Sequence, residues 1–270
     1  MIDRGFLWRE QKLPLRVDPI LDWAPSKSRI FQIVHMSDSH LGLQNYTTQD
    51  GEKVRIPSYK RFIKTIKVIQ DLNPDLVIHT GDIFDENPLL KTKLYHRTKL
   101  KLKEIVDSNI AFCYIRGNHD PYQSDVILSD LLPQWDHVHL GDRDSYSVCD
   151  GKLLLYGIDY RDPSKSTFED VYPPIKEQDQ ICLGLFHQSI AAVTRSFDAS
   201  VSFEDLADKD YSKEYDVVAL GHVHNRRWIK NENISIFVGG SSSGVDCFPS
   251  IGLLTLTSES SHYRCVKLPY

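Results

Sequence analysis

Long apolar runs and paired cysteines are the features that this 270-residue sequence lacks. No apolar run approaches the roughly 20 residues that span a membrane, so we expect no transmembrane segment. The N-terminus has no basic region followed by an apolar stretch, which argues against a secretory signal peptide. The cysteines are odd in number, widely spaced and without a C-x-x-C pair (Cys113, Cys149, Cys182, Cys247 and Cys265). This argues against a disulfide framework or a thiolate zinc site, and it favours a reducing, cytoplasmic location.

An excess of positive charge is also missing. Lys and Arg number 32 against 37 Asp and Glu, for a net charge of -5. This balance excludes a globally basic nucleic-acid coat but leaves a local basic track open. The length suits one large α/β domain, which we place at residues 29–270. Residues 1–28 hold three prolines and two of the four tryptophans, Trp8 and Trp23, and predict an extended arm pinned to the domain surface. A partner-docking arm is the alternative.

Short apolar, β-rich runs recur from residue 30 onward, and we expect them to be strands buried on both faces. The first five cover residues 30–34, 76–78, 110–115, 181–186 and 217–220. Two helical stretches separate the first three: one over about 90–106, and an earlier one with Tyr59, Phe62, Ile63, Ile66 and Ile69 on one face. Later strands are expected at 153–156, 234–238, 253–256 and 263–266. The pattern predicts βαβ units within a layered α/β sandwich around two central sheets.

Polar residues that can bind metals follow each of the first five predicted strands. In chain order the motifs cover residues 37–42, 81–85, 117–120, 187–188 and 221–224. Because ligands bind at the carboxyl ends of strands in open α/β sheets, these motifs should meet in one crevice. Imidazole and carboxylate ligands together suit Mn, Fe or Zn. Gly81, Gly117 and Gly221 would allow close approach of the backbone. Any single motif could be an ordinary turn, but five in order, each after a predicted strand, indicate one metal site.

The order D-x-H, G-D, G-N-H-D, H and G-H-x-H resembles the signature of calcineurin-like metallophosphoesterases, over roughly residues 30–260. The resemblance implies a four-layer α/β/β/α sandwich with two divalent metal ions. We expect manganese, with iron or zinc as the alternatives. It assigns seven ligands, which would hold the first metal (Asp38, His40, His224), the second metal (Asn118, His187, His222) or both (Asp82).

The resemblance also implies hydrolysis of a phosphoester by two-metal chemistry. Water activated between the ions would attack phosphorus in line. His119 would be a catalytic histidine outside the ligand set, which stabilises or protonates the leaving oxygen. Asp85 would orient His119. Arg226, which directly follows the last motif, is a candidate substrate contact.

Within that family the sequence is most similar to SbcD-type DNA repair nucleases. The shared patterns are S-D-x-H-L-G at residues 37–42, G-D-x-F-D at 81–85, H-Q at 187–188 and A-L-G-H-x-H at 219–224. This resemblance implies exo- or endonuclease hydrolysis of DNA in repair or processing, with DNA as a partner and no membrane. SbcD-type chains usually add a capping region and helices that dock an SbcC-like SMC-family ATPase. We expect both to be absent here, so the ATPase partner and the oligomeric state stay open.

Two other functions remain open. A phosphatase or phosphodiesterase acting on a small molecule, a nucleotide or a phosphoprotein would use the same metals in a narrower pocket. A non-catalytic scaffold of the same fold is disfavoured, because all seven ligands and His119 are present. Basic residues at 60–67 and 91–103 either bind nucleic acid or form solvated helix faces. The Gly/Ser-rich residues 239–244 are expected to line the crevice, and they lack the Gly-Lys-Ser/Thr of a P-loop.

Overall fold

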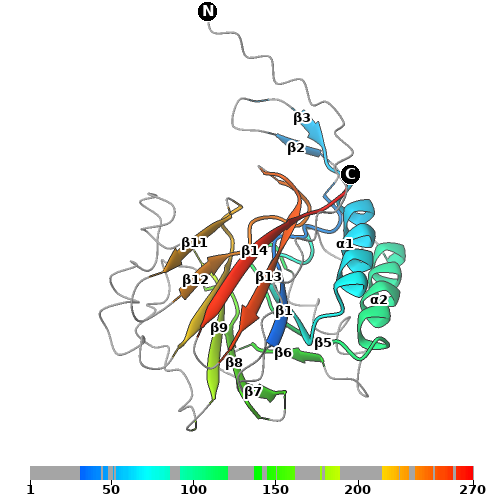
Figure 1. Cartoon of the computed structure of the whole chain (residues 1–270). Helices are drawn as coiled ribbons and strands as arrows, with labels where there is room; N and C mark the ends of the chain where they lie inside the picture. The colour runs from blue at the N-terminus through cyan, green and yellow to red at the C-terminus, as the bar shows by residue number, and fades with distance from the viewer. Residues whose placement is uncertain are drawn as a thin grey trace, which may run out of the picture.

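The computed structural model describes residues 31–43, 45–47, 51, 53–85, 92–120, 137–141, 145–149, 151–161, 177, 180–188, 215–224, 226–230, 235–245, 247–257 and 260–269. The predicted arm at residues 1–28, with Trp8 and Trp23, lies outside the described residues and stays a prediction. Figure 1 shows two β-sheets packed face to face, with two helices covering the outer face of one of them.

The first sheet has the strand order β14-β13-β1-β4-β5-β6. In chain order the strands are β1 (Phe31–Met36), β4 (Leu76–Thr80), β5 (Ala111–Ile115), β6 (His137–His139), β13 (Ser250–Leu256) and β14 (Ser261–Lys267). Strands β1, β4, β5 and β6 run parallel, whereas β13 is antiparallel to both β1 and β14. The carboxyl ends of β1, β4 and β5 therefore lie at the same edge of the sheet.

The second sheet has the order β11-β12-β10-β9-β8-β7. Its strands are β7 (Ser145–Val148), β8 (Leu153–Ile158), β9 (Ile181–His187), β10 (Val217–Gly221), β11 (Arg227–Lys230) and β12 (Ser235–Val238). The four central strands are parallel, and the two edge strands are antiparallel to their neighbours. A separate two-stranded hairpin is formed by β2 (Asn45–Thr47) and β3 (Lys53–Arg55).

The buried side chains form three apolar layers. In β1, Phe31 and Ile33 belong to the layer between the sheets, whereas Val34 and Met36 face the helices. Each such buried side chain stabilises the fold by about 1.5–3 kcal/mol. The outer face of the second sheet is also buried, but the chain between β8 and β9 and between β9 and β10, where a fourth layer was predicted, lies mostly outside the described residues. The α/β sandwich is confirmed, and its fourth layer stays a prediction.

The helices are α1 (Ser58–Leu72) and α2 (Thr92–Val106). Phe62, Ile66 and Ile69 of α1 are buried as predicted, but Ile63 is 37% exposed. The prediction for Ile63 was wrong because one residue turns a helix by about 100°. The stripe that packs on the sheet is completed by Val68 instead.

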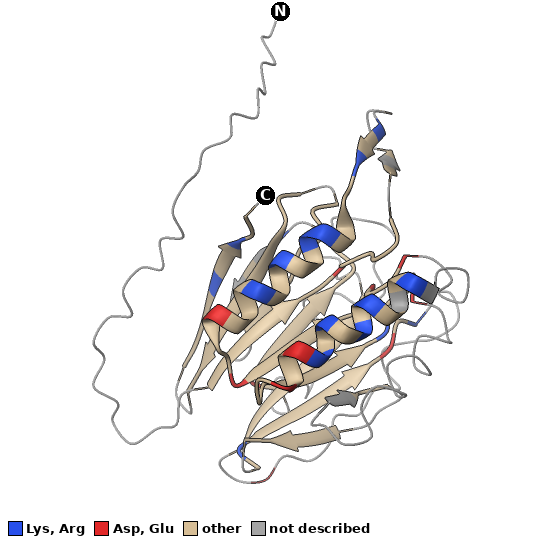
Figure 2. Ribbon diagram, turned by 90° about the vertical axis from the view of Figure 1, so that its right-hand side faces the viewer, with Lys and Arg blue, Asp and Glu red and all other residues tan. Residues whose placement is uncertain are grey.

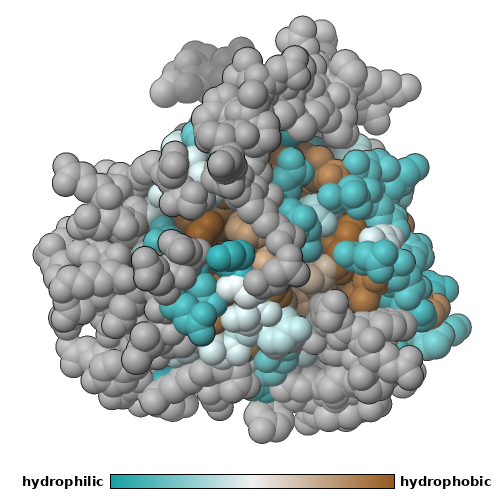
Figure 3. Space-filling model, turned by 60° about the horizontal axis from the view of Figure 1, so that its bottom comes forward, coloured by the Kyte–Doolittle hydropathy of each residue, from teal (hydrophilic) through white to brown (hydrophobic). Residues whose placement is uncertain are grey.

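The outward faces of the helices are hydrophilic. Seen from below, the right side of the molecule, where α1 and α2 lie in Figure 1, carries mainly hydrophilic side chains (Figure 3). Neither described helix is long and apolar enough to cross a membrane.

Candidate metal centre

The five polar motifs come together where the two sheets meet. Two motifs are joined by backbone hydrogen bonds: the amides of Asp38 and His40 donate to the carbonyls of Gly81 (3.1 Å) and Asp82 (2.9 Å). An isolated bridge between Leu41 and Phe84 extends this pairing. The other three motifs follow β5, end β9 and follow β10. Parallel strands thus deliver the predicted ligands to one place, as expected from their carboxyl ends.

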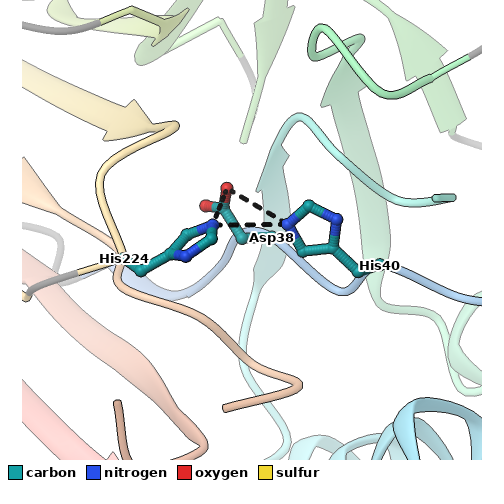
Figure 4. A group of neighbouring side chains, drawn as sticks. All are labelled: Asp38, His40 and His224. Carbon is teal, nitrogen blue, oxygen red and sulfur yellow. Dashed lines mark hydrogen bonds and ion pairs between the residues drawn. The ribbon is translucent and has the colours of Figure 1, made fainter. Parts of the chain in front are cut away.

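Asp38, His40 and His224 form the first group (Figure 4). The Nε2 atoms of the two imidazoles face each other at 3.3 Å. Asp38 Oδ1 lies 3.4 Å from His224 Nε2 and 3.9 Å from His40 Nε2. This oxygen is buried, and it accepts no hydrogen bond from any of the described residues. Three ligand atoms therefore point into one small space, and a buried carboxylate oxygen in it lacks a partner.

Asn118, His187 and His222 form the second group. Asn118 Oδ1 lies 3.0 Å from His187 Nε2 and 2.9 Å from His222 Nδ1. Burial lowers the pKa of His222 to about 4, which keeps its ring neutral as a metal ligand must be. Asp82 lies between the groups: its Oδ2 is 3.3 Å from His187 Nε2 and 3.8 Å from His40 Nε2.

The imidazole orientations fit a bound cation. His187 Nδ1 lies 2.7 Å from the carbonyl of Thr80, which only accepts, so this nitrogen carries the proton. His40 Nδ1 lies 3.1 Å from Asp85 Oδ1 in the same way. In both rings the lone pair is then on Nε2, the atom that faces the other predicted ligands. Outer partners of this kind fix the tautomer of metal-binding histidines.

The carboxylates of this centre are held ionised. Burial raises the pKa of Asp38, but the contact with His224 and the charge of His187 outweigh it and hold the pKa below its usual value. Burial raises the pKa of Asp82 too, and His187 and His40 reverse that effect. Conversely, burial lowers the pKa of His187, but Asp82 overcomes this and raises the pKa to about 9. A proton and a metal ion compete for the same lone pair of His187, so the negative field that attracts one attracts the other.

His119 stands beside the ligands at the surface, with its side chain 45% exposed. Its Nδ1 lies 3.2 Å from Asp85 Oδ1, the same oxygen that contacts His40. The contact with Asp85 raises the pKa of His119. Asp85 is therefore placed to orient His119, as the resemblance implies. It also holds the predicted ligand His40, a contact that the sequence did not indicate.

Arg226 does not join these groups. Its guanidinium donates to the carbonyl of Gly239 (3.0 Å from Nε) and lies 2.6 Å from Cys265 Sγ. These contacts pin the side chain against β14, and substrate contact by Arg226 stays a prediction.

Three glycines allow the close packing of this centre, as predicted. Gly81 has φ +92°, a conformation that other residues rarely adopt. A Cβ on Gly221 would lie 2.0 Å from the carbonyl oxygen of Thr80, and one on Gly117 would lie 2.1 Å from Asp82 Oδ1. The loops pack too tightly for any side chain at these two positions.

Sequence reasoning missed the carboxylate of Asp120. It accepts backbone N–H bonds from Phe84 (2.8 Å), Gly117 (2.9 Å) and Ile83 (3.2 Å), so it joins the G-D and G-N-H-D loops. Burial and the nearby charge of Asp82 raise the pKa of Asp120 to about 7. Asp120 is the last residue of the G-N-H-D motif, but the spacing of the motifs does not indicate which backbone amides donate to its carboxylate.

The Gly/Ser-rich segment after β12 packs against the ligand loop that carries Asp38, and its expected place in the lining of the crevice stays a prediction. Ser241 and Ser243 are buried, and their hydroxyls donate to the carbonyl of Asp38 at 2.9 and 3.2 Å. The segment therefore supports Asp38 from the interior of the protein.

A second support lies beside the second group. Asp159, after β8, accepts from the Arg116 amide at 2.7 Å and from Arg116 Nε at 2.6 Å, and it contacts His139 Nε2 at 2.9 Å. The next residue, Tyr160, places its ring 5.7 Å from that of His222. These contacts tie the end of β5 in one sheet to the end of β8 in the other.

Comparison with known proteins gives a family and two kinds of relative. A family model described as calcineurin-like phosphoesterase matches residues 31–226. A DNA double-strand break repair protein Mre11 from Methanococcus maripaludis is 30% identical over 229 residues, which cover 79% of this chain and 57% of that relative. This chain thus spans little more than half the length of the Mre11 relative.

A second kind of relative matches this chain over almost its whole length. A protein described as a probable cyclic nucleotide phosphodiesterase from Fibrobacter succinogenes is 22% identical over 248 residues, which cover 89% of this chain and 91% of that protein. Among solved structures, a dimetal phosphatase from Danio rerio matches with a TM-score of 0.55 at 8% identity, covering 88% of this chain and 99% of the other. This last likeness concerns the fold alone.

Proposed function

The chain belongs to the calcineurin-like phosphoesterase family, and we propose that within this family it is a metal-dependent nuclease that hydrolyses DNA phosphodiester bonds. The observation that carries the proposal is the convergence of all seven predicted ligand side chains, with His119 and Asp85 beside them. The Mre11 relative, whose name describes DNA double-strand break repair, supports DNA as the substrate.

The family uses a dinuclear metal site, and we propose that the two groups of donors hold one ion each. Asp82 would contribute to both, because its Oδ2 lies between His40 and His187. We propose manganese, since imidazole, carboxylate and amide donors together suit Mn, Fe or Zn better than Mg or Ca. Such ions, when bound, offset charge on phosphoryl oxygens and lower the pKa of water.

The remaining chemistry falls to residues of this chain. His119 is exposed at the edge of the centre, so its Nε2 can reach the leaving oxygen of a bound ester. Asp85 holds His119 Nδ1 and keeps that ring turned toward the centre. His119 would donate a proton to the leaving oxygen, which then departs as an alcohol. General acid catalysis of this kind typically raises the rate by about 10²–10⁴-fold.

A cyclic nucleotide phosphodiesterase is the second candidate. It is favoured by the Fibrobacter succinogenes relative, which this chain covers over 91% of its length. It would use the same centre on a small substrate. Partnership with an SbcC-like ATPase stays open, because no feature of the described residues bears on it.

The deciding experiment is cleavage of a labelled linear DNA duplex in Mn²⁺. Single-stranded DNA, bis-p-nitrophenyl phosphate and a cyclic nucleotide are tested in parallel, each with a His119→Asn variant as control. We expect DNA cleavage that the variant loses by about 10²–10⁴-fold. Turnover of the small esters alone would show that the protein is a small-molecule phosphodiesterase and not a nuclease. No metal uptake and no turnover would favour the non-catalytic scaffold.

A further inference from the structure

A cavity of about 470 Å³ lies beside the metal centre, between the β2–β3 hairpin and the first turns of α1 and α2. Four cationic side chains line it: Arg55, Lys60, Lys93 and Arg97. We propose that this basic cavity binds the phosphodiester backbone of the nucleic-acid strand whose neighbouring phosphate lies at the metal centre. The inference rests on the proposed nuclease function and assigns a second contact to the same substrate.

The charge of the two helices is strongly one-sided. Helix α1 carries four Lys and Arg residues and α2 carries five, against a single acid on each. Figure 2 shows these cations along both helices, with the acids at the far ends. The whole chain has a net charge of -5, so the helices form a local positive face on an otherwise acidic protein. Such a face steers an anionic polymer to one side of the molecule.

The cations of the cavity have no acidic partner in the part of the chain that the structure describes. Arg55, Lys60, Lys93 and Arg97 form no ion pair with any residue in the described part of the chain. By contrast, Lys103, farther along α2, lies 2.9 Å from Asp107, the residue directly after the helix. Unpaired cations gathered around a cavity are the feature that neutralises phosphates, and they release counterions when they do so.

The loop that carries the predicted ligand His40 also lines the cavity. The lining includes Gly42, two residues after His40. Two peptide units span at most about 7.6 Å, so a strand with one phosphate at the centre reaches the cavity within a few nucleotides. Ser58 of α1 donates to the carbonyl of Leu43 at 3.1 Å, and this bond fixes the helix to the same loop.

The lining also suits nucleotides better than a lone inorganic anion. Tyr59, Ile56 and Leu94 lie among the cations. Grooves that bind single strands combine cations for the backbone with an aromatic ring on which a base stacks. The volume of about 470 Å³ holds far more than one phosphate group.

The test compares two double variants with the same change of charge. Lys60→Gln with Lys93→Gln removes two cations from the cavity. Lys67→Gln with Lys103→Gln removes two from the same helices, about 10 and 15 Å farther along the helix axes. Both pairs are made in a His119→Asn background loaded with Mn²⁺, so that bound DNA stays intact, and duplex binding is measured over a range of salt. Hydrolysis of bis-p-nitrophenyl phosphate is measured for each pair with His119 restored.

We expect the cavity pair to weaken DNA binding on the order of tenfold and to reduce the slope of log affinity against log salt by about 1.8, or 0.9 for each contact. The control pair should bind as its parent does, and both pairs should hydrolyse the small ester normally. Unchanged affinity and slope in the cavity pair, or an equal loss in the control pair, would overturn the inference while leaving the nuclease in place. Ester hydrolysis by the unmodified protein, together with no DNA binding by its His119→Asn parent variant, would overturn the proposed function as well.

Discussion

Four of the predicted ligands hold a backbone conformation that residues other than glycine rarely adopt. The φ angles are +50° at Asp38, +42° at His40, +54° at Asp82 and +75° at His222. Each costs about 1–2 kcal/mol in an unsupported chain. Hydrogen bonds between the loops offset this cost, among them those from the amides of Asp38 and His40. Strain gathered at one place is typical of functional sites, and here it turns the side chains inward.

The tight contact at Gly117 gives a prediction at this scale. In Gly117→Ala the new Cβ would lie 2.1 Å from Asp82 Oδ1 and 2.5 Å from the Asp82 amide nitrogen, which cannot yield without moving the loop. We expect a loss of about 1–3 kcal/mol in unfolding free energy, measured by urea denaturation. Displacing Asp82 by about 1 Å should also lower phosphoester hydrolysis by about 10²-fold.

The matched control is Gly151→Ala. Gly151 has φ +76°, and a Cβ there meets nothing within 4 Å. This variant should lose some stability from backbone strain but keep full activity. Full activity in Gly117→Ala would show that Asp82 does not depend on this contact.

At the level of single residues, the sequence indicated which side chains meet but not what supports them. The ligand motifs each stand in a short, contiguous pattern. Apart from Gly117, the partners of Asp120 lie more than thirty residues away, and those of Arg226 lie on other segments, so no local pattern indicates them. Arg226 follows a motif directly, yet its guanidinium is held by Gly239 and Cys265.

At the scale of the elements, two histidines lie within the strands beneath the centre. His35 of β1 and His79 of β4 are buried, with Nε2 of each bonded to a hydroxyl: Thr80 at 2.9 Å and Ser39 at 2.8 Å. The Nδ1 atom of each ring is buried and has no hydrogen-bond partner among the described residues. A proton added there would place a charge in the core without an acceptor.

These two histidines should make the fold sensitive to acid. Burial, helped by the charge of Arg226 on His35, lowers the pKa of both rings from 6.5 to about 3, although Asp38 acts in the opposite direction. Between pH 6.5 and 3 the unfolded chain therefore binds more protons than the folded chain, and stability falls as the pH is lowered through this window. At pH 5 each histidine should cost about 2 kcal/mol relative to neutral pH.

Urea denaturation at pH 7.5 and pH 5 measures this effect. His35→Gln should reduce the difference in unfolding free energy between the two pH values by about 2 kcal/mol. His96→Gln, on the exposed face of α2, should leave the difference unchanged. An unaltered pH dependence in His35→Gln would mean that His35 takes up a proton in the folded protein as readily as in the unfolded chain.

At the scale of the whole molecule, the sequence predicted the strands and their alternation with helices because buried parallel strands leave continuous apolar runs. It could not predict that β13, near the end of the chain, pairs with β1, as in the match of Phe31 with Leu256. That pairing depends on contacts across more than two hundred residues. Motifs placed after strands still predicted the metal centre, since parallel strands bring their carboxyl ends together in any order.

The central claim is that this fold builds one centre for two ions, and anomalous diffraction from crystals soaked in Mn²⁺ tests it most directly. We predict two peaks about 3.5–4 Å apart, with Asp82 between them. One should lie among the first group (Asp38, His40, His224) and the other among the second (Asn118, His187, His222). A single peak, or peaks away from these side chains, would contradict the account.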